Sequence, residues 1–228
     1  MKLFRIMLAI GMLGGMLLAV GCTMDMHNPT ATEQNVQIVG DSVFDLSGEI
    51  QTDLKTLSGK MYKDRSVSGA KIAAIQSQLN TALGRTTLKT VIADGGANDI
   101  LQGSMDCDAD PLTSGCLDVL NYIGDKMDAM LYSMYTKSPD YSVWLGYYHV
   151  KGSEIEKNEA IDYAYSAIYP GVFSPYAPGS GVNYIYVDPR SIIVPADIKS
   201  DDIHPTSSGS QKLATLIWNA MVGNNMYR

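Results

Sequence analysis

The sequence has no cluster of positive charge in its body, few cysteines and only one long hydrophobic run. The formal net charge is −7 at pH 7, and no basic cluster follows Lys2 and Arg5. Proteins that bind nucleic acid need clustered Lys and Arg to pair with phosphates, so this class of protein is disfavoured. A net negative charge favours solubility and says little about the substrate.

The scarcity of cysteine limits what the cysteines can do. Of the three, Cys107 and Cys116 flank a short loop and have no further Cys or His ligands nearby, so we expect no metal site. If the chain is exported, an oxidising compartment favours a disulfide. We therefore predict a Cys107–Cys116 bridge that closes the loop.

The single long hydrophobic run lies at the N-terminus. Residues 6–20 are apolar, follow Lys2 and Arg5, and lead into Leu-Ala-Val-Gly-Cys22. This pattern is typical of a signal peptide, and its end resembles the bacterial lipobox, where cleavage leaves a cysteine that carries lipid. An uncleaved transmembrane anchor is the alternative, but the run is short for a membrane span.

The leader sets the predicted domains and location. Residues 1–21 are predicted to be a lipoprotein signal peptide, and residues 22–35 are polar and form a tether. Residues 36–228 suit one domain, expected to be monomeric. The residue after Cys22 is Thr23 and not Asp. By resemblance to lipoprotein sorting in Gram-negative bacteria, this predicts a location in the cell envelope, at the outer membrane. The protein would face the periplasm or the cell surface.

The rest of the chain alternates β-favouring runs with apolar residues at helical spacing. Strands are expected from residue 36 to 42, 61 to 67, 88 to 93, 141 to 150 and 182 to 187, and helices over 46–57, 70–83, 117–135, 157–169 and 205–222. This alternation predicts an α/β fold with a five-stranded parallel sheet covered on both faces. Ligands in such folds bind beyond the carboxyl ends of the strands.

The first expected strand ends in Gly40-Asp41-Ser42. Gly40 permits a sharp turn, and Ser42 then stands where a helix begins, next to free N–H groups of the helix N-terminus. A hydroxyl in this place suits a nucleophile whose product oxygen becomes an anion. The alternative is a serine that only caps the helix.

Three later sequence blocks favour the interpretation of Ser42 as a nucleophile. Gly69 lies in Ser-Val-Ser-Gly-Ala, Asn98 in Gly-Gly-Ala-Asn-Asp, and His204 in Asp-Asp-Ile-His-Pro. Ser, Gly, Asn and His in this order and these contexts resemble the four blocks of the SGNH hydrolases, also called the GDSL esterase/lipase family. The resemblance covers nearly the whole chain after the leader. The sequence differs from the family pattern directly after the serine. Val43-Phe44 stands there, whereas Leu-Thr or a similar pair is common in the family.

The resemblance implies a three-layer, flavodoxin-like α/β/α fold and hydrolysis of carboxylic esters through an acyl-serine, without a cofactor or metal. Ser42 would be the nucleophile, His204 its base, and Asp201 the carboxylate that orients the imidazole. The backbone N–H groups of Ser42 and Gly69 and the amide of Asn98 would form the oxyanion hole.

Other functions stay open at this point. The chain has no Gly-x-Ser-x-Gly motif, which disfavours the α/β-hydrolase fold, and His149 is a competing base without the Asp-x-x-His context. An O-acyltransferase acting on envelope glycan and a non-catalytic lipoprotein that binds glycan or lipid are the alternatives. The expected rim, 107–116, 147–149 and 170–181, contains no long apolar segment, so we expect short acyl groups on a water-exposed alcohol, lipid or sugar.

Overall fold

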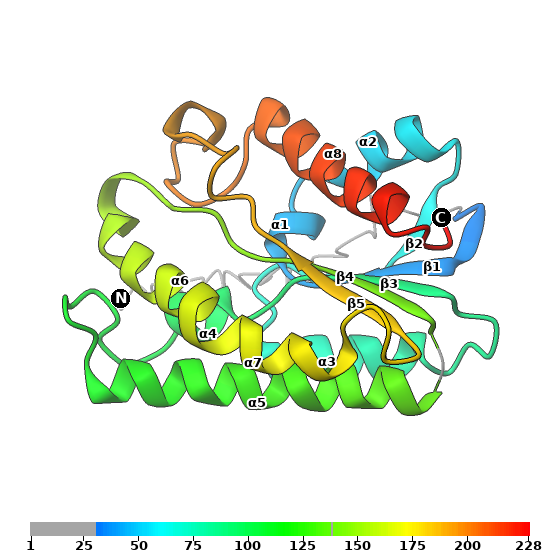
Figure 1. Ribbon diagram of the computed structural model, residues 1–228. Coiled ribbons are helices and arrows are strands. Elements are labelled where there is room, and N and C mark those ends of the chain that lie inside the picture. Colours follow the sequence, from blue (N-terminus) through cyan, green and yellow to red (C-terminus); the bar gives the residue numbers. More distant parts are fainter. Residues whose placement is uncertain (1–30, 138) are drawn as a thin grey trace, which may run out of the picture.

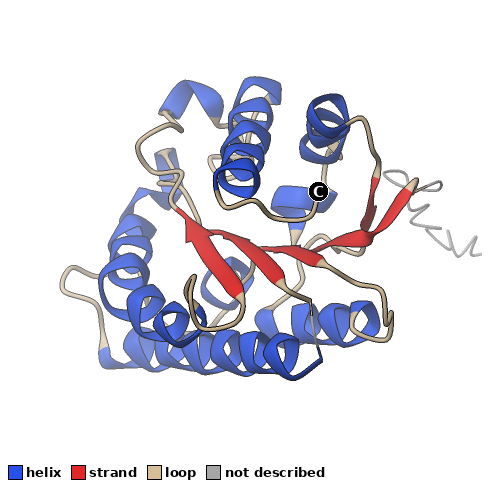
Figure 2. Cartoon of the chain, turned by 45° about the vertical axis from the view of Figure 1, so that its right-hand side comes forward, coloured by secondary structure: helices blue, strands red, loops and turns tan. Residues whose placement is uncertain are grey.

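The computed structural model describes residues 31–137 and 139–228. The predicted signal peptide, Cys22 and most of the predicted tether lie outside the described residues. The described chain forms one five-stranded sheet between two layers of helices (Figures 1 and 2), which confirms the three-layer prediction.

The strand order is β2-β1-β3-β4-β5, and every neighbouring pair is parallel. The strands are β1 (Glu33–Val39), β2 (Tyr62–Asp64), β3 (Thr90–Ala93), β4 (Tyr141–Leu145) and β5 (Asn183–Val187). This is the flavodoxin-like order, and it places the carboxyl ends of all five strands at one edge of the sheet.

Helices cover both faces of the sheet (Figure 1). One face carries α3 (Ile72–Ala82), α5 (Ser114–Lys137), α6 (Asn158–Tyr163) and α7 (Tyr169–Phe173), and the other carries α2 (Glu49–Ser58) and α8 (Ser207–Gly223). Two short helices, α1 (Ser42–Asp45) and α4 (Ala97–Leu101), begin just beyond strand ends. A π-helix, η2 (Ala164–Ile168), joins α6 to α7, and 3₁₀-helices are η1 (Gly152–Lys157), η3 (Ser174–Tyr176) and η4 (Pro195–Asp197).

The two helical layers form two separate apolar cores. In β3, Val91 packs into the core with α3 and α5, whereas the next residue, Ile92, packs into the core with α2 and α8. Both side chains are fully buried. A central parallel strand is covered on both faces, which explains why its sequence is a continuous apolar run. Within the described chain, no helix combines the length and the apolar character needed to cross a membrane.

Several element boundaries differ from the sequence-based prediction. Gly48, in the left-handed region at φ 63°, delays the start of α2 to Glu49, and Leu46 is left exposed. The expected helix over 157–169 is divided by the π-helix, and the expected loop from Pro170 begins with α7, because proline is tolerated in the first turn of a helix. The helix α4 has only five residues, too few for a periodic signal.

The predicted disulfide between Cys107 and Cys116 is present. Both cysteines are buried in a small apolar cluster with Leu120 and Ala160. The loop that they close is also tied to η1, because Lys157 Nζ donates to Asp108 Oδ1 at 2.8 Å. The bridge therefore holds the loop against the start of α5, and the Lys157–Asp108 contact ties the same loop to η1.

Candidate active site

Ser42 is the first residue of α1, at the carboxyl end of β1. Asp41 caps this helix, since its Oδ1 accepts the N–H of Val43 at 3.0 Å, so the interpretation of Ser42 as the cap is wrong. The N–H of Asp41 donates to Asp94 Oδ1 at 2.8 Å. A side chain at Gly40 would overlap the Asp94 carboxyl group. The turn before Ser42 is thus held tightly against β3.

His204 is bound to both of its predicted partners. Its Nε2 lies 2.8 Å from Ser42 Oγ, and its Nδ1 lies 3.0 Å from Asp201 Oδ2. With the ring proton on Nδ1 donated to Asp201, Nε2 accepts the hydroxyl proton of Ser42. The structure therefore brings together the three residues of the predicted triad in the geometry of nucleophile, base and orienting carboxylate.

Asp201 also shapes the loop that presents His204. Its Oδ1 accepts the backbone N–H groups of Ile203 at 3.1 Å and His204 at 2.9 Å. Partial burial raises the pKa of Asp201, but these hydrogen bonds and that from the imidazole outweigh burial and hold the pKa below its usual value. Asp201 is therefore ionised at neutral pH. The neighbouring Asp202 instead accepts from the N–H and Oγ of Ser153.

The three predicted oxyanion donors lie at the same edge of the sheet. Within residues 31–137 and 139–228, the N–H groups of Ser42 and Gly69 donate to no internal acceptor. Gly69 has φ +77°, a conformation that favours glycine. The Asn98 amide donates to Asp41 Oδ2 at 3.3 Å and to the carbonyl oxygen of Ala70 at 3.2 Å. Asn98 thus contacts the neighbours of both Ser42 and Gly69.

Behind the nucleophile lies a buried polar network that the sequence reasoning missed. Tyr147 donates its hydroxyl proton to Asp41 Oδ2 at 2.6 Å. Burial raises the pKa of Asp41, and burial together with the charge of Asp41 raises that of Asp94 well above its usual value. Asp94 Oδ2 is buried without a hydrogen-bond partner, so we expect Asp94 to carry the proton of this pair. The sequence signal that could have revealed this network is the carboxyl group of Asp94, which directly follows the apolar strand β3.

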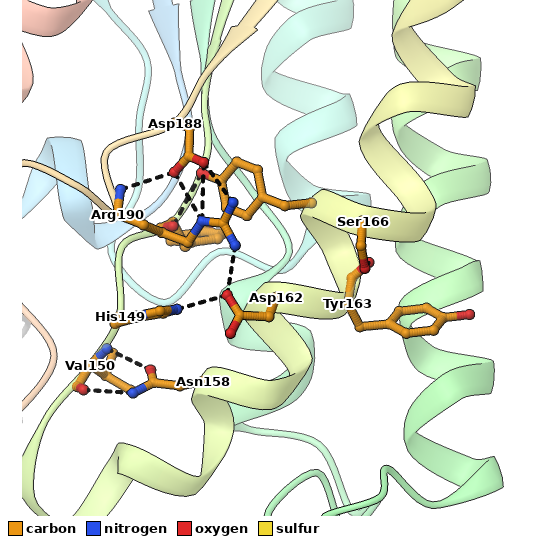
Figure 3. Close-up of polar contacts among 10 residues, drawn as sticks. His149, Val150, Asn158, Asp162, Tyr163, Ser166, Asp188 and Arg190 are labelled. Atoms are coloured by element: carbon orange, nitrogen blue, oxygen red, sulfur yellow. Dashed lines mark hydrogen bonds and ion pairs between the residues drawn. The ribbon is translucent and has the colours of Figure 1, made fainter.

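His149, the competing base, belongs to a different network (Figure 3). Its Nε2 lies 2.8 Å from Asp162 Oδ1, which also accepts from Arg190 Nη1 at 2.6 Å. Arg190 forms further hydrogen bonds with Asp188 and lies over the ring of Tyr165. The hydroxyl of Ser42 is bonded to His204, and the structure gives His149 no contact with it.

A cavity of about 80 Å³ lies beside the nucleophile. Ser42, Asn98 and Tyr147 line it together with apolar side chains from α4, α5, α6 and the π-helix. The expectation that the site lacks apolar wall is therefore wrong. Four helices each contribute two or three apolar side chains to this wall, so no single segment of the sequence reveals it.

No protein-family model and no curated protein sequence matches the chain. Solved structures of several esterases share its fold. A family 3 carbohydrate esterase of Clostridium thermocellum has a TM-score of 0.61 at 22% identity. The match covers 82% of this chain and 94% of the chain of that esterase. An acetylxylan esterase from Geobacillus stearothermophilus has a TM-score of 0.59 at 13% identity, and the match covers 82% of this chain and 93% of the chain of that esterase. A GDSL-like lipase from Bacteroides thetaiotaomicron has a TM-score of 0.58 at 13% identity, and the match covers 82% of this chain and 87% of the chain of that lipase.

The order of the strands and these likenesses define the class of fold as that of the SGNH, or GDSL-type, hydrolases. The resemblance in the four sequence blocks is thereby confirmed at the level of the fold. The serine, histidine and aspartate that the blocks predicted lie within hydrogen-bonding distance of one another, in the order Ser42–His204–Asp201.

Proposed function

We propose that the protein is a serine ester hydrolase that cleaves carboxylic esters through an acyl-serine intermediate. The observation that carries this proposal is the chain of hydrogen bonds from Ser42 Oγ to His204 Nε2 and from His204 Nδ1 to Asp201. A serine hydroxyl is a poor nucleophile until a base takes its proton, and this chain supplies that base.

In the first half of the reaction, Ser42 Oγ attacks the ester carbonyl carbon and its proton passes to His204 Nε2. The N–H groups of Ser42 and Gly69 hold the oxygen that becomes negative, with the Asn98 amide as a third donor once it turns from its present acceptors. His204 then gives its proton to the leaving alcohol. Water repeats the sequence, with His204 as base, and releases the acid and the free serine.

We propose short acyl esters of a water-exposed alcohol or sugar as the substrates. Two of the similar structures are named for esterases of carbohydrate or acetylxylan, which supports a sugar ester. The small size of the cavity beside Ser42 supports a short acyl group.

Labelling by a fluorophosphonate probe tests the proposed mechanism, because only an activated serine reacts with it. We expect one label for each protein molecule and expect peptide mapping to place it on Ser42. Heat-denatured protein is the control and should not react. Folded protein that takes no label, or takes it on another serine, would contradict the proposed function.

We further propose that the chain is exported and anchored to a membrane through lipid on Cys22, on the basis of its leader sequence. In a bacterial host with lipoprotein processing, the wild-type N-terminal peptide should begin at a lipid-modified Cys22, and Cys22→Ser should leave the precursor unlipidated and uncleaved. Mass spectrometry of that peptide is the measurement. An unmodified Cys22, or a leader still attached to the wild-type protein, would refute the anchor.

A further inference from the structure

The cavity beside Ser42 is enclosed by helices, and one side chain separates it from a second hollow of the surface. We propose that this cavity binds the acyl group of the substrate and that Ile168 of the π-helix limits the acyl chain length. The proposal rests on the proposed esterase function and adds the residue that selects the acyl group.

The chemistry of the cavity wall favours an alkyl chain. Ile100, Ile123 and Ile161 contribute apolar surface to it. Of the three tyrosines that line it, two have hydroxyl groups that are already used, that of Tyr147 by Asp41 and that of Tyr148 by the carbonyl oxygen of Ile203. The hydroxyl groups of a sugar would lose hydrogen bonds with water in such a space, whereas an alkyl chain would not. The alcohol part of the ester therefore stays outside.

The volume of the cavity limits the length of the acyl chain that it can hold. A cavity of about 80 Å³ is small and suits a short alkyl chain. The alkyl part of a butyryl group has three carbons beyond the carbonyl. We therefore expect butyryl to fill the cavity and longer chains to meet its wall.

Ile168 stands between this cavity and an open groove of about 410 Å³ beside α5 and α7. It is the residue that lines both spaces. Its side chain packs against Gly124 of α5, where an added Cβ would lie 2.8 Å from Ile168 Cγ2. Truncating Ile168 to alanine should join the two spaces and let a longer chain pass between α5 and the π-helix.

Part of the cavity wall packs against the disulfide. The buried bridge Cys107–Cys116 packs with Leu120 and Ala160, and Ile100 packs against the same cluster. All three of these side chains also line the cavity. Since this part of the wall is braced by a covalent bond, we place the limit on chain length at Ile168.

The test is kcat/KM for p-nitrophenyl acetate, butyrate and octanoate. Burial of a methylene group gives about 0.8 kcal/mol, or about fourfold, so the wild type should prefer butyrate to acetate by about 15-fold. It should prefer butyrate to octanoate by about tenfold or more, since octanoate does not fit. Ile168→Ala should raise the octanoate-to-butyrate ratio by about tenfold, because the octanoate chain then has room beyond the wild-type wall.

Two further variants make the result specific. Val172→Ala removes a branched side chain that lines the groove and not the cavity, and it should leave the chain-length profile unchanged. Ala164→Leu adds volume inside the cavity and should move the preference to acetate. An unaltered profile in Ile168→Ala would overturn the role of Ile168. An unaltered profile in Ala164→Leu, or a wild-type rate that rises steadily to octanoate, would overturn the acyl pocket. Failure of the proposed function would differ, because then no ester would be hydrolysed and no probe would label Ser42.

Discussion

Replacing Ser42 by alanine should lower kcat/KM for ester hydrolysis by about 10⁴-fold or more, as in other enzymes whose triad nucleophile is removed. The hydroxyl that lies 2.8 Å from His204 Nε2 is the atom that would form the acyl bond, and alanine cannot replace it. The fold should survive the change. The cap of α1 is supplied by Asp41 and not by Ser42, so the substitution removes no hydrogen bond from the helix N-terminus.

The measurement is kcat/KM with p-nitrophenyl butyrate, together with the melting temperature. Ser77→Ala is the matched control, since Ser77 lies exposed on α3 and its hydroxyl only donates to the carbonyl of the preceding turn. That variant should keep activity within about twofold, in line with most surface substitutions. Activity of Ser42→Ala near that of the wild type would disprove the acyl-serine mechanism.

Replacing Asp201 by asparagine should lower kcat by about 10⁴-fold, because the imidazole is then held in the wrong tautomer. The asparagine oxygen can take over the role of Oδ1 and accept the N–H groups of Ile203 and His204, so the loop should keep its shape. Its amide N–H₂ then faces His204 Nδ1 as a donor. Nδ1 becomes the acceptor, the proton moves to Nε2, and Nε2 can no longer accept the proton of Ser42.

Asp202→Asn is the matched control for this experiment. Asp202 is the adjacent carboxylate, but it contacts Ser153 and not His204, and its φ of 66° is a conformation that asparagine tolerates well. Its kcat should stay within about threefold of the wild type, as is usual for substitutions outside the site. Equal losses in both variants, or a larger loss at Asp202, would show that Asp201 does not orient the base.

The sequence determined the elements and the local parts of the site. The apolar run before Gly40 fixed the position of β1, and the helical spacing of apolar residues fixed the main helices, because these signals arise within a few residues of one another. The contact of Asp201 with His204 is also local, since the two residues are three apart in one loop. These features could be predicted because each depends on neighbours along the chain.

Only the tertiary structure decided which distant groups meet. Ser42 and His204 are 162 residues apart, and they touch because the parallel sheet brings the ends of β1 and β5 to one edge. The bond from Tyr147 to Asp41 and the position of Ile168 between cavity and groove follow from the packing of separate elements. Such contacts leave no periodic signal, because nothing in a short segment records which other segment will lie against it. The sequence could therefore name the proposed nucleophile and base, while the proposed acyl pocket appeared only when four helices had packed around the edge of the sheet.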